Sequence, residues 1–306
     1  FDIGSGDSVQ IQFDGSDQLD SPLVYTFAQP APEPRHRPHQ RHPETDVRIV
    51  SFNAYVDGLS DPKRAPAMKR LLQAVGGDIY CFQEEWESTD IAKIARRLAL
   101  LDSVGLKYVH KVHGNVIASK YPLRALSLGN TPYAAARVEI NGQSLVVMSV
   151  HLKAMGYIGS KEDLRRIQQA GVLLETVTEI NRGDYNHPKQ PDVKPGIVMV
   201  GDYNLVGSRT PVDLLAIKEI TGLANWVLPH LVGESVITWR GGLRSSFAPG
   251  KLDYSLYSAD RLTPKNGFVL DTERLSQSEL NQLALEKTDS SASDHLLMVA
   301  DFQFKD

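Results

Sequence analysis

The sequence predicts an α/β protein, in which short strands alternate with about four helices and are numerous enough to form two sheets. Short apolar runs rich in β-branched residues recur throughout the chain, and most of them are bounded by Gly, Pro, Asn or Asp. Segments with helical spacing of apolar residues separate several of these runs. Residues 107–150, by contrast, contain only strand-like runs and turns, which indicates a β-rich middle.

The strands are predicted from apolar runs that end at turn residues. Asn141-Gly142, between two alternating runs, is a strong signal for a hairpin. The run IVMV at 197–200 is short and β-branched, which is typical of a buried strand. The predicted strands are 47–52, 79–82, 107–112, 115–120, 123–128, 133–140, 144–150, 197–200, 235–239, 252–257, 268–270 and 296–304.

The helices are predicted from their start and stop signals. Ser160 and Asp163 have the form of a capping box, and Gly183 ends the helix that they begin. Pro211 with Asp213 marks the start of another helix. The helices expected are 64–75, 91–101, 160–181, one that begins at 210, and a short last one capped by Ser276 with Glu279.

Composition limits the class of protein. The 306 residues suffice for one large domain or two small ones, and a net charge of −4 argues against a broad basic surface that coats a nucleic-acid duplex. The single cysteine, Cys81, excludes an internal disulfide and a thiolate zinc cluster, and its apolar surroundings favour a buried side chain. No apolar stretch reaches membrane-spanning length, and no signal-peptide pattern is visible. We expect a monomer.

The first part of the chain differs from the rest. Residues 1–28 alternate apolar and polar side chains, which predicts a β hairpin or the remnant of an upstream β domain. Residues 29–44 are dense in Pro and His, which predicts an extended linker, and a flexible linker preorganises no metal site. The main domain is expected at 45–306. Because the chain begins at Phe1 and not at methionine, we expect that the true amino terminus was removed, as a leader or as an upstream domain. The location of this soluble chain therefore stays open, with secretion or the periplasm as alternatives if a leader was removed.

Polar residues of one kind stand at the ends of the predicted strands. Carboxylate and amide oxygens are hard ligands that suit Mg²⁺, Mn²⁺ or Ca²⁺. The sequence has no cysteine cluster and no His-Glu-x-x-His helix, which argues against a structural or protease-type zinc site. These strand-end residues are Asn53, Glu84, His151, Asp202 with Asn204, Asp253, and Asp294 with His295.

Taken in order, the segments RIVSFN, FQEE, SVHL, GDYN, LDY and SDH resemble the motifs of the endonuclease/exonuclease/phosphatase superfamily, which includes deoxyribonuclease I and the abasic-site endonucleases. Each segment alone is a weak signal, but the set in this order is highly specific. The resemblance covers residues 47–304. It implies a four-layered αββα sandwich, with two mixed sheets face to face and helices outside, and a metal-dependent hydrolysis of phosphoesters.

The resemblance also implies a metal site. Glu84 matches the glutamate that binds the catalytic metal, and Asn53 and Asp294 match the residues that assist it. The expected cofactor is Mg²⁺, with Mn²⁺ and Ca²⁺ as alternatives.

Five further residues take catalytic roles by the same resemblance. His295 matches the histidine at the side of the attacking water, and Asp253 the acid that orients its ring, because a carboxylate on one ring nitrogen fixes the tautomer and raises the basicity of the other. Asp202 is expected to position the water or assist the leaving oxygen, and Asn204 to bond a phosphoryl oxygen. His151 matches the histidine that donates to the scissile phosphate.

The substrate stays open at this stage. Arg137, Arg240 and Arg244 are candidates to bind substrate charge, whereas Trp239 is expected in the core. The Trp-Cys-Asp-Arg signature of the inositol-phosphatase branch is missing, since that place has PGKLDYSLY, and the histidine of SVHL is shared with deoxyribonuclease I and the sphingomyelinases. We therefore expect a nuclease-like phosphodiesterase. The alternatives are a phosphomonoesterase, a phospholipid or sphingomyelinase-type phosphodiesterase, and a catalytically silent binding module.

Overall fold

The computed structural model describes residues 39–128, 131–185, 194–241 and 245–305. The chain divides into two units, Phe1–Arg37 and Pro38–Asp306, and every described residue belongs to the second unit. The hairpin predicted at 1–28 and most of the linker predicted at 29–44 therefore lie outside the described residues. Residues 39–44 contact the main domain, because Arg41 forms an ion pair with Asp78 at 2.6 Å and the His42 amide bonds Asp301.

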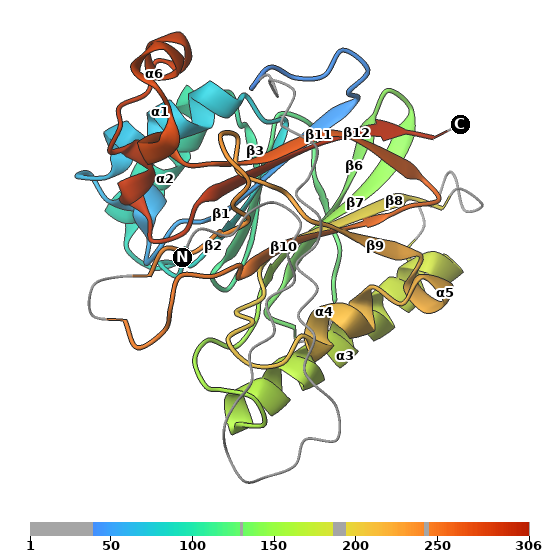
Figure 1. Ribbon diagram of the computed structural model, residues 1–306. Helices are drawn as coiled ribbons and strands as arrows, with labels where there is room; N and C mark the ends of the chain where they lie inside the picture. Colours follow the sequence, from blue (N-terminus) through green and yellow to red (C-terminus); the bar gives the residue numbers. More distant parts are fainter. Residues whose placement is uncertain (1–38, 129–130, 186–193, 242–244, 306) are drawn as a thin grey trace, which may run out of the picture. The chain divides into compact units, whose positions relative to one another are not determined.

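Twelve strands of the described part form two six-stranded mixed sheets (Figure 1). The first sheet has the order β11-β12-β1-β2-β4-β3, and the second has the order β5-β6-β7-β8-β10-β9. The strands are β1 Val47–Asn53, β2 Ile79–Gln83, β3 Tyr108–Val112, β4 Asn115–Ser119, β5 Arg124–Ala125, β6 Ala134–Ile140, β7 Gln143–His151, β8 Gly196–Asp202, β9 Leu223–Trp226, β10 Asp253–Ser258, β11 Leu262–Leu270 and β12 Leu297–Phe304.

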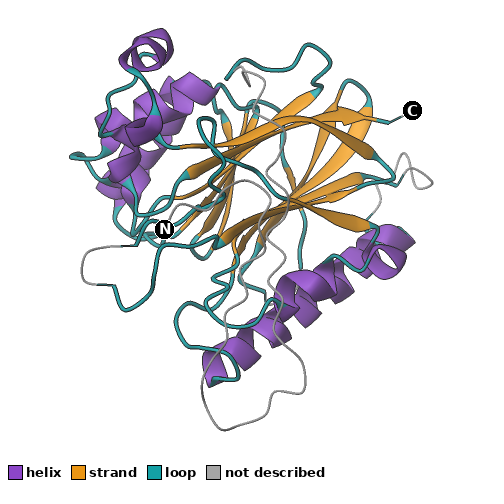
Figure 2. Ribbon diagram, in the orientation of Figure 1, coloured by secondary structure: helices purple, strands orange, loops and turns teal. Residues whose placement is uncertain are grey.

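The helices cover the outer faces of the two sheets (Figure 2). They are α1 Ala65–Val75, α2 Ile91–Ser103, α3 Lys161–Arg182, α4 Thr210–Leu215, α5 Lys218–Thr221 and α6 Gln277–Leu283. The side chain of Ser160 caps α3 by accepting from the Asp163 amide, and Ser276 with Glu279 forms a full capping box on α6, as predicted. Of the helices that the structure describes, none is long and apolar enough to cross a membrane.

Three apolar clusters account for the layers. Side chains such as Ile49, Val147 and Val198 fill the space between the two sheets. A second cluster lies between the first sheet and α1, α2 and α6, and a third lies between the second sheet and α3 and α4. Because β1, β2 and β8 are covered on both faces, every residue of these strands is buried, instead of every second one. The predicted four-layered αββα sandwich is confirmed.

Some predicted elements differ from the observed ones. The segment 235–239, predicted as a strand, makes only isolated bridges from Trp239 to Gly250 and to His295. Within this segment, the hydroxyl oxygen of Thr238 accepts hydrogen bonds from the amides of Leu252 and Asp253, and so binds the residues where β10 begins. The predicted strand at 123–128 is reduced to the two residues of β5, and β9 was not predicted.

Candidate active site

The predicted site residues meet at one edge of both sheets because the strand register brings them there. In the first sheet, Asn53 at the end of β1 pairs with Gln83, the residue before Glu84. In the second sheet, Asp202 at the end of β8 pairs with His151 on one side and with Asp253 on the other. The loop before β12 brings the remaining pair, Asp294 and His295, to the same edge. There the Ser293 hydroxyl donates to the Asn53 carbonyl oxygen and accepts from the His295 amide.

His295 is held between two buried carboxylates. Its Nδ1 lies 2.8 Å from Oδ2 of Asp253, and its Nε2 lies 3.6 Å from Oδ2 of Asp202. Burial alone lowers the pKa of His295, but the negative charges of Asp253 and Asp202 outweigh burial and raise it above the ordinary value. Burial also raises the pKa of Asp202, which the positive charge of His295 opposes and the Asp253 carboxylate reinforces.

Asn53 links the two halves of the site. Its Nδ2 donates to Oε1 of Glu84 and to Oδ2 of Asp202, both at 3.1 Å, and it lies 3.4 Å from Nε2 of His295. Its Oδ1 accepts from the Tyr55 amide at 3.0 Å, which fixes the orientation of the side-chain amide. Asn53 is fully buried. Its side chain, which comes from the first sheet, is thus bonded to an acid of each sheet.

Glu84 and Asn204 have strained backbones. Both have positive φ angles, 64° and 49°, which are uncommon for residues other than glycine and concentrate at functional sites. The Val56 amide holds the Glu84 carboxylate by donating to Oε2 at 3.1 Å. Asn204 bonds Asp202 through its amide N–H and through Nδ2, and Nδ2 also donates to the Leu152 carbonyl oxygen. The amide group of Asn204 therefore holds Asp202 in place.

Position 201 in the GDYN motif requires glycine for a steric reason. Its φ is +148°, and a Cβ atom there would lie 1.9 Å from the Val150 carbonyl oxygen on β7. Only glycine lets β8 approach β7 closely enough at this point to place Asp202 beside His151.

His151 completes a candidate metal-binding group with Glu84 and Asp202, whose ligand atoms lie within 4.8 Å of one another. Its Nε2 lies 3.9 Å from Oε1 of Glu84 and 3.6 Å from Oδ2 of Asp202, and it is buried without a hydrogen-bond partner in the described residues. Burial, with the nearby charge of His295, lowers the pKa of His151 to about 4, so the ring is neutral near pH 7.

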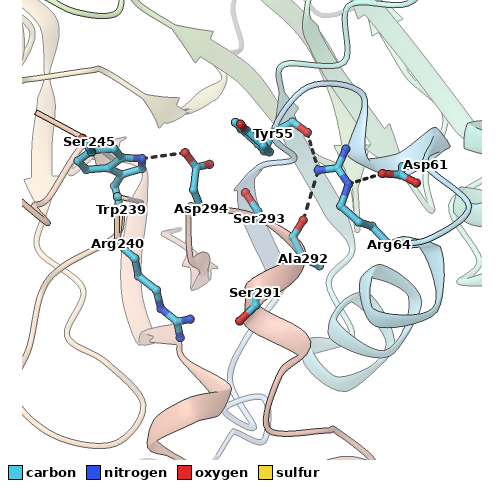
Figure 3. Close-up of a pocket in the computed structure, with 11 residues that line it drawn as sticks. Tyr55, Asp61, Arg64, Trp239, Arg240, Ser245, Ser291, Ala292, Ser293 and Asp294 are labelled. Carbon is cyan, nitrogen blue, oxygen red and sulfur yellow. Dashed lines mark hydrogen bonds and ion pairs between the residues drawn. The ribbon is translucent and has the colours of Figure 1, made fainter. Parts of the chain in front are cut away.

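Asp294 lies at the border of a pocket of about 660 Å³ (Figure 3). Its Oδ2 accepts from the indole N–H of Trp239 at 3.0 Å, and its Oδ1 is buried without a hydrogen-bond partner in the described residues. Trp239 is only half-buried, so it lines the pocket and orients Asp294 instead of filling the core. Tyr55 and Arg64 lie on the opposite wall, and the Arg64 guanidinium is bound by Asp61 and by backbone carbonyl oxygens.

The three arginines proposed from the sequence do not gather at this site. Arg240 lines the pocket, but its guanidinium pairs with Asp271 and Glu273 and is directed away from Asp294 (Figure 3). Arg137 pairs with Val146 of β7, five residues before His151, which places it about 16 Å away along the strand on the α3 side of the sheet. Arg244 lies outside the described residues.

Two groups that support the site were not predicted from the sequence. The ring of Trp86 lies 5.7 Å from the ring of His151 and covers it on the solvent side. Beneath the site, the Ser149 hydroxyl accepts from Gln83 Nε2 and contacts Asn115 Oδ1, which links β7 of one sheet to β2 and β4 of the other. The signal for the Ser149 network in the sequence was a polar residue inside an apolar strand, which is costly unless it has a partner.

The fold has clear structural relatives, although no protein-family model and no curated protein matches the chain. The catalytic domain of human Nocturnin with a bound sulfate anion has a TM-score of 0.58 and 19% identity over 87% of this chain and 96% of that one. The endonuclease/exonuclease/phosphatase from Bacteroides vulgatus has a TM-score of 0.58 and 15% identity over 85% and 100% of the two chains. A Staphylococcus aureus beta toxin variant with bound magnesium ions has a TM-score of 0.56 and 18% identity over 84% and 99%.

These likenesses cover nearly the whole of each relative. The two six-stranded sheets with outer helices are the arrangement that the resemblance of the sequence motifs implies. The chain therefore has the fold of the endonuclease/exonuclease/phosphatase superfamily.

Proposed function

We propose that the protein is a metal-dependent phosphodiesterase that hydrolyses its substrate by attack of water on phosphorus. The observation that carries the proposal is the convergence of the His295–Asp253 pair with Glu84, Asp202 and His151 at one edge of both sheets. In the described residues, the ion-pair partners of Glu84 and Asp202 are histidines only, so the acids have no lysine or arginine to neutralise them. Acids that lack a lysine or arginine partner favour the binding of a cation.

The donor set fits a hard divalent cation such as Mg²⁺ or Mn²⁺. Oδ1 of Asp294 is a buried carboxylate oxygen without a partner in the described residues, and such an atom needs a ligand. We assign Glu84 and Asp294 to the cation, with Asp202 beside it, and we assign Asn53, predicted from the sequence as a ligand, to holding the carboxylates of Glu84 and Asp202 through Nδ2. The beta toxin structure with the same fold contains magnesium ions. When bound, the cation supplies positive charge that stabilises the negative charge growing on the phosphoryl oxygens.

We assign the activation of the attacking water to His295. Because Asp253 accepts the Nδ1 proton, Nε2 faces the site and takes the proton of the water. The charges of Asp253 and Asp202, which raise the pKa of His295, stabilise the imidazolium ring that this proton transfer forms. Asp202, whose pKa burial also raises, is then suited to hold a proton for the leaving oxygen.

Two further residues position the reacting groups: His151 binds the phosphate, and Asn204 holds the carboxylate of Asp202. His151 is neutral and its Nε2 has no hydrogen-bond partner among the described residues, so it can donate to a phosphoryl oxygen without adding a charge. The amide of Asn204 is engaged with Asp202, so we assign Asn204 to positioning that acid and not to direct contact with the phosphate.

The proposal is tested with two small esters. We expect hydrolysis of bis-p-nitrophenyl phosphate to exceed that of p-nitrophenyl phosphate, to require Mg²⁺ or Mn²⁺ and to stop with a chelator. His295→Ala and Asp202→Ala should each lose several orders of magnitude in kcat, while circular dichroism shows a normal fold. Wild-type rates in either variant would contradict the assigned roles. No turnover of either ester with any metal would favour a binding module.

One observation favours a phospholipid substrate as the second candidate. The loop that follows His151 exposes Met155, Tyr157 and Ile158 by 60%, 73% and 72%, and Leu164 of α3 is exposed beside them in the sequence. Apolar side chains that gather in one exposed loop are typical of a surface that contacts a partner or a membrane.

A vesicle assay separates the two candidates. Tyr157→Ser with Ile158→Ser should lower hydrolysis of phospholipid vesicles at least tenfold if the loop contacts lipid. Ile91→Ser is the control, because Ile91 is even more exposed, at 82%, but begins α2 on the first sheet. Equal vesicle activity in the loop variant and the control would remove the lipid candidate.

A further inference from the structure

The pocket of about 660 Å³ that Asp294 borders adjoins the proposed hydrolytic site directly (Figure 3). Two of its lining residues, Ser293 and Asp294, immediately precede His295, and the Ser293 hydroxyl bonds the Asn53 carbonyl oxygen and the His295 amide. A third lining residue, Tyr55, donates its amide to Oδ1 of Asn53. The volume of the pocket is within the range of about 300–1,000 Å³ that is usual for small-molecule sites. A substrate bound at Asp294 therefore has room to place one of its groups here.

The first aromatic wall of the pocket, Tyr55, is carried by a strained turn. Tyr55, Val56 and Asp57 have consecutive positive φ angles of 50°, 43° and 57°, which are uncommon for residues other than glycine and concentrate at functional sites. Arg64 holds the turn by donating to the carbonyl oxygens of Tyr55 and Val56 at 2.6 and 2.8 Å. Oε2 of Glu84 holds it from the site by accepting from the Val56 amide. Tyr55 is nevertheless 49% exposed, so the strained turn holds an aromatic ring at the pocket and not in the core.

The second aromatic wall, Trp239, is fixed at one edge and only half-buried. Its indole N–H donates to Oδ2 of Asp294 at 3.0 Å, and its backbone pairs with Gly250 and His295. Gly241 lies beside the six-membered ring, because a Cβ atom at this position would lie 3.1 Å from Cη2 of the indole. The lack of a side chain at Gly241 leaves this part of the ring uncovered. The indole therefore offers part of its surface to the pocket that it lines.

The charge and polarity of the pocket suit an uncharged planar group. Its guanidinium groups are committed, because Arg64 bonds Asp61 at 2.8 Å and Arg240 pairs with two acids that do not line the pocket. A second phosphate would therefore find no unpaired arginine among the described lining residues, and a quaternary ammonium group would meet two guanidinium charges. Ala292 is the one aliphatic side chain among these described residues, which disfavours an acyl chain. Aromatic rings and hydroxyl groups remain, and both suit a heterocyclic base.

We propose that this pocket binds a nucleobase of the substrate, so that the scissile phosphodiester belongs to a nucleotide. The inference rests on the proposed phosphodiesterase function and names the class of its substrate. Tyr55 and Trp239 supply aromatic faces on which a base stacks, and the exposed residues Ser245 and Ser291 supply hydroxyl groups for its polar edge. Because Trp239 also bonds Asp294, the same side chain contacts the base and orients a proposed ligand of the cation.

The catalytic test compares dithymidine phosphate with an analogue in which both sugars are tetrahydrofuran rings without a base. The two molecules share the scissile phosphodiester, so the ratio of their kcat/KM values reports the contribution of the bases. Tyr55→Ala should lower this ratio about tenfold, mainly through KM, whereas Tyr55→Phe keeps the ring and should change it by less than about twofold. Tyr108→Ala is the matched control, because Tyr108 is 41% exposed but lies on β3 at an edge of the first sheet.

A binding test keeps the inference separate from catalysis. Trp86→Phe with Trp226→Phe leaves Trp239 as the only one of the three tryptophans of the chain. In this protein, with Mg²⁺ present, thymidine 5′-monophosphate should quench the fluorescence of Trp239 and bind at least about tenfold more tightly than 2-deoxyribose 5-phosphate. Adding Tyr55→Ala should remove most of this difference in affinity.

The outcomes separate the pocket from the proposed function. Equal affinities for the two monophosphates, or a ratio of kcat/KM that is unchanged in Tyr55→Ala, would overturn the assignment of the pocket. Hydrolysis of bis-p-nitrophenyl phosphate with no preference for dithymidine phosphate over its analogue would keep the proposed function and overturn the pocket. Tight binding of thymidine 5′-monophosphate without hydrolysis of any phosphodiester would overturn the proposed function, whereas the base site would stand.

Discussion

Oδ2 of Asp253 lies 2.8 Å from Nδ1 of His295, although Asp253 begins β10 of the second sheet and His295 precedes β12 of the first. This bond orients the histidine and raises its basicity. Asp253→Asn should therefore lower kcat by about 10²- to 10⁴-fold, with little change in KM. Steady-state kinetics on bis-p-nitrophenyl phosphate measures the effect, and thermal unfolding checks the fold. A variant with native activity would show that the pair is structural.

Glu84 should control metal affinity. Glu84→Gln removes the carboxylate charge but keeps the size of the side chain, so the Mg²⁺ concentration for half-maximal activity should rise at least about tenfold. Glu175→Gln on the exposed face of α3 is the matched control and should leave the Mg²⁺ titration unchanged. Calorimetric titration of Mg²⁺ provides a second readout, and equal affinities for both variants would speak against Glu84 as a ligand.

Two glycines should respond in opposite ways to alanine. Gly201→Ala should lower the free energy of unfolding by about 3 kcal/mol or more, because its Cβ would lie 1.9 Å from the Val150 carbonyl oxygen at a φ of +148°. Gly171 lies inside α3 with nothing within 4 Å of a Cβ, so Gly171→Ala should raise the free energy of unfolding by about 1 kcal/mol. Urea unfolding of both variants checks the pair, and a neutral Gly201→Ala would disprove the steric argument.

Lys251 should make stability depend on pH. Its Nζ is buried without a hydrogen-bond partner in the described residues, and burial with the nearby Arg209 charge lowers its pKa from 10.5 to about 8. The folded state therefore disfavours the proton, although the Tyr254 ring, 4.3 Å from Nζ, offsets part of this. Lys251→Met should raise the free energy of unfolding at pH 7 by about 1–2 kcal/mol.

The sign of the pH dependence follows from linkage. Between pH 8 and 10.5 the unfolded wild-type chain holds the Lys251 proton and the folded chain does not, so wild-type stability rises with pH in this range. The advantage of Lys251→Met should therefore be largest below pH 8 and vanish near pH 10.5. Urea unfolding at pH 7 and at pH 9.5 checks this, and an advantage that grows with pH would contradict it.

The residues of the candidate site could be placed near one another from the sequence because they stand at the ends of buried strands. His151 and Asp202 end adjacent parallel strands, so their apolar runs and their order already place them together. The layers could be predicted from the motif resemblance and from continuous apolar runs such as 197–200. Contacts that depend on side-chain orientation could not be predicted.

The residues that were missed or misplaced illustrate this limit. Trp239 appeared to be a core residue because its run SVITW is apolar, yet its indole N–H is turned toward Asp294. Arg240 appeared to be free because its acidic partners, Asp271 and Glu273, are distant in the sequence. The network of Ser149, Gln83 and Asn115 likewise joins residues that only the packing of the two sheets brings together.

The place of β12 has a consequence for when activity arises during synthesis. This last strand of the described chain lies inside the first sheet, between β11 and β1, and His295 precedes it by two residues. A nascent chain that ends before β12 has the second sheet complete but lacks the strand that pairs with β1. Because such long-range pairings form slowly, the hydrolytic centre should assemble as one of the final events of folding. An incomplete chain is therefore expected to carry most of the acids and yet have no phosphoesterase activity.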